Sequence, residues 1–113
     1  MKCKVTTYKT LHGTKEILEP KKKKNTQWII YQDNNPKYLI DLFDLRTESN
    51  VILNSLIFCA KKRSITEILK IINKKNNVNL SVPKLPLFQV KVKSEYKELE
   101  LESIPEEWVS YSL

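Results

Sequence analysis

The chain has a single glycine, Gly13, among 113 residues, and this scarcity limits what the sequence can build. Phosphate-binding loops and dinucleotide-binding fingerprints need several positions without a Cβ atom, so that the backbone can approach phosphate groups. Tightly coiled barrels of the OB type place glycines at their bulges. The sequence therefore excludes a P-loop or a Rossmann nucleotide site and disfavours an OB barrel.

The length fits one domain that spans residues 1–113. A hydrophobic fraction of 41% supplies enough apolar side chains for one core. The longest apolar stretch, residues 51–60, is shorter than the roughly 20 residues of a membrane span, and no apolar run of a secretory signal follows the N-terminus. Cys3 and Cys59 lack CxxC spacing. We therefore expect a cytoplasmic protein in a reducing compartment, with no membrane association.

The first third of the chain predicts three β-strands. Apolar or small side chains alternate with polar ones over residues 3–8, and the pair His12-Gly13 offers a turn into a second strand over residues 14–19. The β-branched and aromatic side chains of residues 26–32 are typical of a buried strand.

The middle third predicts helices. Asn35 can cap a first helix while Pro36 occupies its first position, where the missing N–H costs nothing. Residues 51–63 are apolar nearly all round, as in a central helix. Ser64 and Glu67 have the spacing of a capping box, which predicts the start of a further helix.

The last third predicts a β-hairpin. Residues 88–92 and 96–102 both alternate with a period of two, and Ser94-Glu95 would form the turn between them. A final short helical turn carries Trp108. The predicted order is βββ-αα(α)-ββ, which indicates an α+β fold: one antiparallel sheet of about five strands with the helices packed on one face.

Charge is divided unevenly along the chain. Residues 1–93 hold 19 Lys and Arg against 7 Asp and Glu, a net charge of +12, whereas residues 94–113 hold one Lys and 6 Glu, a net charge of −5. We expect the glutamates of the last strand to pair with Lys91 and Lys93 across the hairpin. An acidic docking surface is the alternative.

The residues that usually carry catalysis are sparse. His12 is the only histidine and lies in an expected turn, and Cys59 lies within an apolar stretch, so neither indicates a nucleophile or a zinc ligand. Asp41 and Asp44 could hold Mg²⁺ in a nuclease, but the expected helix places them on its polar face, where charges are ordinary. We expect a protein without enzyme activity, metal or cofactor.

Basic side chains gather in three clusters that predict binding to phosphate groups. Lysines at helix C-termini also offset the helix dipole, whereas a four-lysine loop has no such structural need. Only 2 of the 20 basic residues are Arg, which disfavours base readout in a groove and favours sequence-independent, salt-sensitive binding. The candidate nucleic-acid-binding residues are Lys21, Lys22, Lys23, Lys24, Lys61, Lys62, Arg63, Lys74 and Lys75.

Two alternatives to this interpretation stay open. An AT-rich coding sequence also produces a chain rich in Lys, Asn and Ile, so genome composition could account for part of the charge. Tyr8, Trp28, Tyr31 and Phe88 could stack on bases from one face of a sheet, or they could fill the core.

One segment resembles a known family. The run Trp-Ile-Ile-Tyr-Gln-Asp-Asn-Asn-Pro-Lys-Tyr-Leu-Ile-Asp-Leu-Phe over residues 28–43, followed by Ser49 and Ile52-Leu53-Asn54, resembles an early segment of portal proteins from tailed phages that infect Bacteroidetes. That family has a similar aromatic strand, an Asp-Asn-Pro-type turn and a helix with a Leu-Ile-x-Leu core. This chain lacks the family's aromatic residue before the proline and its glycine-rich continuation, and a complete portal is several times longer. The resemblance implies a phage or mobile-element origin.

Together these features predict a small basic non-enzymatic binding protein that engages nucleic acid or a nucleoprotein complex with an acidic surface. Phage proteins of this size and charge include inhibitors of host defence, such as anti-CRISPR proteins. The alternative is a virion or portal-related structural component that docks on other proteins through residues 28–43. Neither the partner nor the oligomeric state follows from the sequence.

Overall fold

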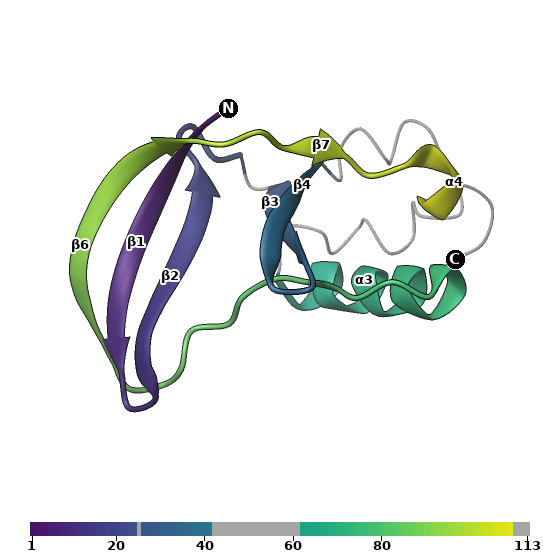
Figure 1. The fold of residues 1–113 in the computed structure, drawn as a ribbon. Helices are drawn as coiled ribbons and strands as arrows, with labels where there is room; N and C mark the ends of the chain where they lie inside the picture. Colours follow the sequence, from purple (N-terminus) through teal and green to yellow (C-terminus); the bar gives the residue numbers. More distant parts are fainter. Residues whose placement is uncertain (25, 42–61, 110–113) are drawn as a thin grey trace.

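The computed structural model describes residues 1–24, 26–41 and 62–109, with the backbone alone for residues 62–64 and 109 (Figure 1). The α+β class predicted from the sequence is confirmed. The elements, in chain order, are β1 (Lys2–Thr10), β2 (Gly13–Pro20), β3 (Gln27–Gln32), β4 (Asn35–Asp41), α3 (Lys62–Asn76), β5 (Leu80–Ser81), β6 (Gln89–Glu98), β7 (Glu102–Ser103) and α4 (Glu106–Val109).

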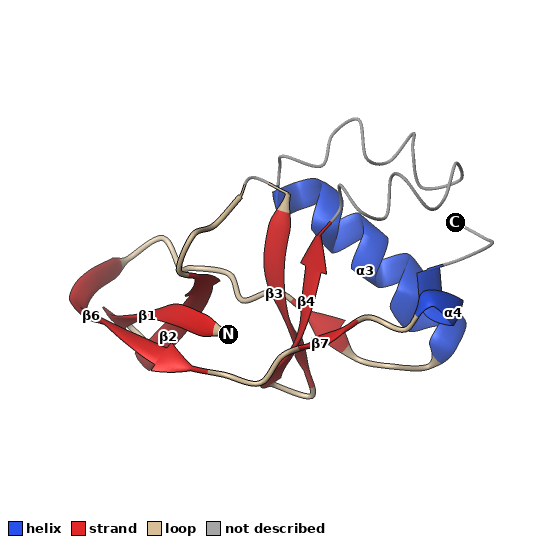
Figure 2. Cartoon of the chain, turned by 90° about the horizontal axis from the view of Figure 1, so that it is seen from above, coloured by secondary structure: helices blue, strands red, loops and turns tan. Residues whose placement is uncertain are grey.

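The described strands form two sheets, so the prediction of one five-stranded sheet is wrong. The N-terminal sheet has the order β2-β1-β6, and the central sheet has the order β5-β3-β4-β7. Neighbouring strands are antiparallel except β4 and β7, which are parallel. In Figures 1 and 2 the central sheet lies between the N-terminal sheet and α3. The central sheet therefore contributes to two layers of packing.

The β1–β2 hairpin agrees with the sequence prediction. Its turn ends at Gly13, whose φ of +107° lies in the region that a residue without a Cβ adopts freely. The Thr10 hydroxyl oxygen accepts a hydrogen bond from the His12 N–H at 3.2 Å, and the hydroxyl donates to the Gly13 carbonyl at 2.7 Å. The first two predicted strands and the turn between them are confirmed.

The helix predicted to begin at Asn35 is wrong, because residues 35–41 form strand β4. Asp33 and Asn34 have φ values of +51° and +69°, which close a two-residue hairpin turn between β3 and β4. Pro36 lies next to a register shift, where the missing N–H interrupts no regular pair. Tyr38 is buried while its neighbour Lys37 is exposed, as in a strand with one face on the core.

Helix α3 begins earlier than the capping box predicted. Its backbone is already helical at Lys62, so Ser64 lies within the first turn and cannot be the N-cap. The predicted helix over residues 51–63 falls largely outside the described residues. The predicted apolar face is confirmed, since Ile65, Ile68, Leu69 and Ile72 are buried. The helix ends at Asn76, and Asn77 follows with a left-handed φ of +52°.

Strand β6 replaces the predicted C-terminal hairpin. Ser94 and Glu95 form no turn, because the chain continues as one strand paired with the whole length of β1. The predicted pairs between Lys91 or Lys93 and a neighbouring strand of glutamates are therefore wrong. Glu95 instead accepts ion pairs from two lysines of its own strand, Lys93 at 3.9 Å and Lys97 at 3.6 Å. The predicted final helical turn with Trp108 is confirmed as α4.

The main core lies between the central sheet and α3. The buried members of this core cluster are Trp28, Ile30, Tyr38, Ile40, Ile65, Ile68, Leu69, Ile72, Leu80 and Ile104. The opposite face of the central sheet packs on the N-terminal sheet, where Cys3, Val5 and Ile29 are almost fully buried. Burial raises the pKa of the Cys3 thiol, which is free and inside this second layer. No helix in the described part of the chain has the length and apolar character needed to cross a bilayer.

Candidate nucleic-acid interface

The basic residues selected from the sequence do not gather on one surface. Lys21 to Lys24 are all exposed in the loop between β2 and β3. Lys74 and Lys75 lie in the last turn of α3, at the other end of the molecule, beside α4 (Figure 1). Lys61 falls outside the described residues, as do the side chains of Lys62 and Arg63. The predicted clusters therefore do not form one continuous interface within the described residues.

The N-terminal sheet presents a different basic surface. In β1, Cys3, Val5 and Thr7 face the central sheet, and alternation places Lys4 and Tyr8 on the opposite side. In both views of the fold, the central sheet and the two described helices lie on one side of the N-terminal sheet (Figures 1 and 2). The register places the following residues on the other side, here called the open face: Lys2, Lys4, Thr6, Tyr8, Lys15, Ile17, Glu19, Lys91, Ser94, Tyr96 and Glu98.

The open face carries an excess of positive charge. Four strand lysines share it, and Lys21 joins them from the loop after β2, where its backbone N–H donates to the Lys2 carbonyl at 3.2 Å. Its two carboxylates are both neutralised by neighbours: Glu19 by Lys23 at 3.5 Å and Glu98 by the Met1 amine at 2.8 Å. A surface with five lysines and paired carboxylates attracts polyanions.

Two tyrosines lie among these lysines. Tyr96 is 54% exposed and lies opposite Lys4 in the register. The amine of Lys21 lies 5.4 Å from the centroid of the Tyr96 ring, a cation–π distance. Tyr8 is partly exposed, four residues along β1 from Lys4. With a rise of about 3.3 Å per residue and about 4.8 Å between strands, the two tyrosine Cα atoms are about 14 Å apart.

Hydroxyl groups occupy the space between the tyrosines. The Thr6 and Ser94 hydroxyls lie 3.2 Å apart and share a hydrogen bond across β1 and β6. Thr6 is buried because its side chain is short and its neighbours on the face are longer. The open face thus alternates aromatic rings, hydroxyls and amines along its length.

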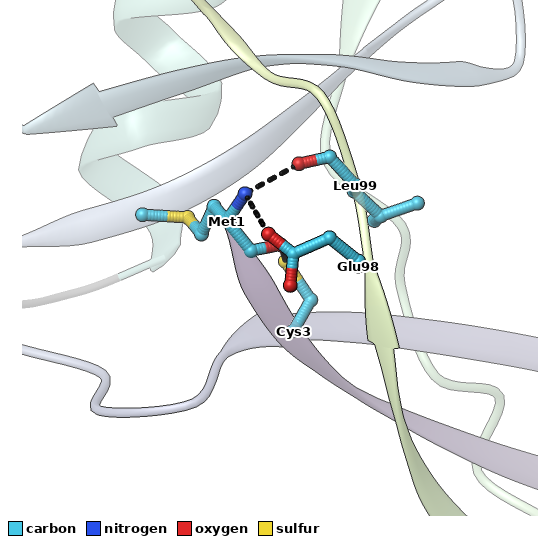
Figure 3. Close-up of polar contacts among 4 residues, drawn as sticks. All are labelled: Met1, Cys3, Glu98 and Leu99. Carbon is cyan, nitrogen blue, oxygen red and sulfur yellow. Dashed lines mark hydrogen bonds and ion pairs between the residues drawn. The ribbon is translucent and has the colours of Figure 1, made fainter.

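Contacts at the N-terminus hold the end of β6 against β1 (Figure 3). The Met1 amine donates to the Leu99 carbonyl at 2.7 Å, and the Leu99 N–H donates back to the Met1 carbonyl at 2.8 Å. The hydrogen bond to Glu98 raises the pKa of the Met1 amine and lowers the pKa of the Glu98 carboxyl. These contacts fix the strand that carries Tyr96.

The other aromatic residues considered from the sequence lie elsewhere. Trp28 is buried in the main core, and Phe88 is 71% exposed just before β6. Tyr31 lies between the sheets, where burial first and then the Glu16 carboxylate raise its pKa to about 12. The Leu18 backbone is close to its hydroxyl, but no described group meets hydrogen-bonding geometry with it. Of the four candidates, only Tyr8 lies on the open face.

Sequence reasoning missed Lys2, Lys4, Lys15, Lys91 and Tyr96 because they are dispersed along three strands. Lys2, Lys4 and Lys91 alternate with apolar or small residues, which is the ordinary pattern of a half-solvated strand. Their common face depends on pairing between β1 and β6, whose paired residues are 79 to 96 positions apart in the sequence. The available signal was the repeated Lys-x-Lys spacing at both ends of the chain.

The described residues contain no group of three or more His, Cys, Asp or Glu side chains arranged to hold a metal ion. His12 is exposed in the β1–β2 turn. In comparisons with known proteins, no family model, curated protein or solved structure matches the chain.

Proposed function

We propose that the protein binds single-stranded nucleic acid through the open face of its N-terminal sheet, without sequence specificity and without catalysis. The observation that carries the proposal is the position of Tyr8 and Tyr96 among five lysines on a sheet face that no described helix or strand covers. Aromatic platforms within a positively charged surface are the usual means of binding single strands.

The chemistry of the face favours a single strand over a duplex. Every base has a π-face that can stack on a tyrosine ring, whereas a duplex keeps its bases stacked on each other. Extracting a paired base costs a few kcal/mol, which these lysines would have to offset. Lysine amines act as point charges toward phosphate and do not read base edges in the bidentate manner of arginine. The expected binding is therefore tolerant of sequence and sensitive to salt.

The test compares two variants of equal charge. One replaces three lysines of the open face, Lys4, Lys15 and Lys91, with Gln. The matched control replaces three exposed lysines of α3, Lys70, Lys74 and Lys75, with Gln. Fluorescence anisotropy follows binding to labelled single-stranded DNA, single-stranded RNA and duplex DNA at about 50 mM salt, where phosphate contacts are strong.

We expect the wild type to bind single strands more tightly than the duplex. The open-face variant should bind on the order of 100-fold more weakly, because three phosphate contacts and their counterion release are lost. The α3 variant should retain most of the affinity. Equal losses in the two variants would mean that net charge alone causes binding, and no binding by the wild type would overturn the proposal.

A further inference from the structure

Strand β6 is an exposed edge that carries apolar side chains among its charged ones. It pairs with β1 on one side, and no described strand pairs with its other side. Val90 is 67% exposed, Val92 59% and Tyr96 54%, and Phe88 just before the strand is 71% exposed. A long edge strand with apolar side chains is a template for another strand, and soluble proteins usually cover or shorten such an edge.

The other edge of the N-terminal sheet is strand β2, and another segment of the chain covers it. The Lys15 amine of β2 donates to the Lys84 carbonyl, so the segment before β6 crosses beside this strand. Ile17 of β2 and Val82 of that segment line a common cavity of about 160 Å³. The described chain therefore shields β2 and leaves β6 open.

We propose that β6 pairs in antiparallel orientation with β6 of a second copy of this chain. The charges along the strand favour this occupant, because its first half has a net charge of +2 from Lys91 and Lys93, whereas its second half has a net charge of −1 from Glu95, Lys97 and Glu98. Glu100 follows and extends the acidic end. Antiparallel pairing centred near Ser94 places Lys93 of each copy opposite Glu95 of the other and Lys91 opposite Lys97, whereas parallel pairing in register would place every charge opposite its like.

The geometry also brings apolar side chains together. A two-fold axis near Ser94 places Val92 of one copy opposite Tyr96 of the other, and a β-branched residue opposite an aromatic one stabilises a strand pair. The pairing is isologous, so the assembly closes at two copies. The result is one six-stranded sheet built from two N-terminal sheets of three strands.

The two-fold axis of an antiparallel strand pair is perpendicular to the sheet, so both open faces lie on the same side. If the open face binds nucleic acid as proposed above, the dimer presents one continuous surface of twice the length. Dimerisation itself is measured without nucleic acid, so its failure and the failure of the proposed function can be told apart.

The first test is sedimentation equilibrium of the full chain over a range of concentrations. We expect the mass to rise from that of the 13.3 kDa chain toward twice that value. Val92→Lys replaces the apolar side chain opposite Tyr96 with a charge and should weaken the dimer about 10-fold or more, because both Val92–Tyr96 contacts are lost. Leu85→Lys is the control, because Leu85 is also exposed but lies on the segment beside β2. A monomer at all concentrations, or equal effects of the two changes, would overturn the proposal.

The second test fixes the orientation. Ser94→Cys should form a disulfide-linked dimer on mild oxidation, because the two-fold axis brings the two introduced thiols together. Thr14→Cys, an exposed residue of the other edge strand β2, is the control and should form no disulfide-linked dimer. Circular dichroism checks that each variant keeps its fold. Cross-linking of the Thr14 variant in place of the Ser94 variant would exclude pairing through β6.

Discussion

The ring of Tyr96 is expected to contribute directly to binding of single-stranded nucleic acid. The side chain is 54% exposed and lies under the Lys21 amine at 5.4 Å, so it can receive a base while its neighbour contacts the phosphate. Stacking of a base on an aromatic ring is worth about 1–3 kcal/mol, which corresponds to a Kd increase of about 5- to 150-fold in Tyr96→Ala. Fluorescence anisotropy with a labelled oligonucleotide measures this change.

Two controls separate stacking from other effects. Tyr96→Phe keeps the ring and should bind within about 2-fold of the wild type, because the stacking surface is unchanged. The ratio of wild-type to Tyr96→Ala affinity should stay constant across a salt series, since losing a ring releases no counterions. In the double variant Tyr8→Ala/Tyr96→Ala, the increase in Kd should equal the product of the increases in the two single variants. The two Cα atoms are about 14 Å apart, and the free-energy effects of distant substitutions add. An equal loss of affinity in Tyr96→Phe and Tyr96→Ala, or no loss in Tyr96→Ala, would refute the stacking role.

Three further outcomes follow from the same structure. If five lysines contact phosphates, a plot of the logarithm of the binding constant against the logarithm of the salt concentration should have a slope of about −3.5 for the wild type. The slope should be about −1.4 for the open-face variant, in which three of these lysines are replaced. An anisotropy series over a range of salt concentrations measures both slopes. Tyr31 should titrate at about 12 in the folded protein, against the ordinary value of 10.0, so the stability it contributes is full below pH 10 and is lost as pH rises toward 12. A tyrosinate absorbance titration of wild type and Tyr31→Phe checks this. Ile30→Ala should lower the free energy of unfolding by about 2–5 kcal/mol, because Ile30 is 0% exposed in the main core, whereas Val92→Ala should change it by less than about 0.5 kcal/mol in chemical denaturation.

The local features of the fold could be predicted where side-chain pattern and turn chemistry agree. Gly13 marks the turn of the first hairpin, and the apolar spacing of Ile65, Ile68 and Ile72 marks the buried face of α3. The error at Asn35 came from a conflict between two signals. Asn before Pro is typical of a helix start, but Asp33 and Asn34 also favour the left-handed conformation of a hairpin turn, and the structure uses that turn.

The long-range features could not be predicted from local pattern. Ser94-Glu95 has the composition of a turn, yet pairing of β6 with β1 holds these residues in an extended strand, where Ser94 meets Thr6. The same pairing creates the open face from lysines that are dispersed in the sequence. The cluster that stood out most, Lys21 to Lys24, contributes Lys21 to that face, while Lys74 and Lys75 lie at the far end of α3.

The most direct test of the open face is a titration of ¹⁵N-labelled protein with a short single-stranded oligonucleotide, followed through backbone amide shifts. We expect the largest changes at Lys4, Thr6, Ser94 and Tyr96, with the amides of α3 unchanged. Changes concentrated in the last turn of α3, with none in β1 and β6, would contradict binding through the open face.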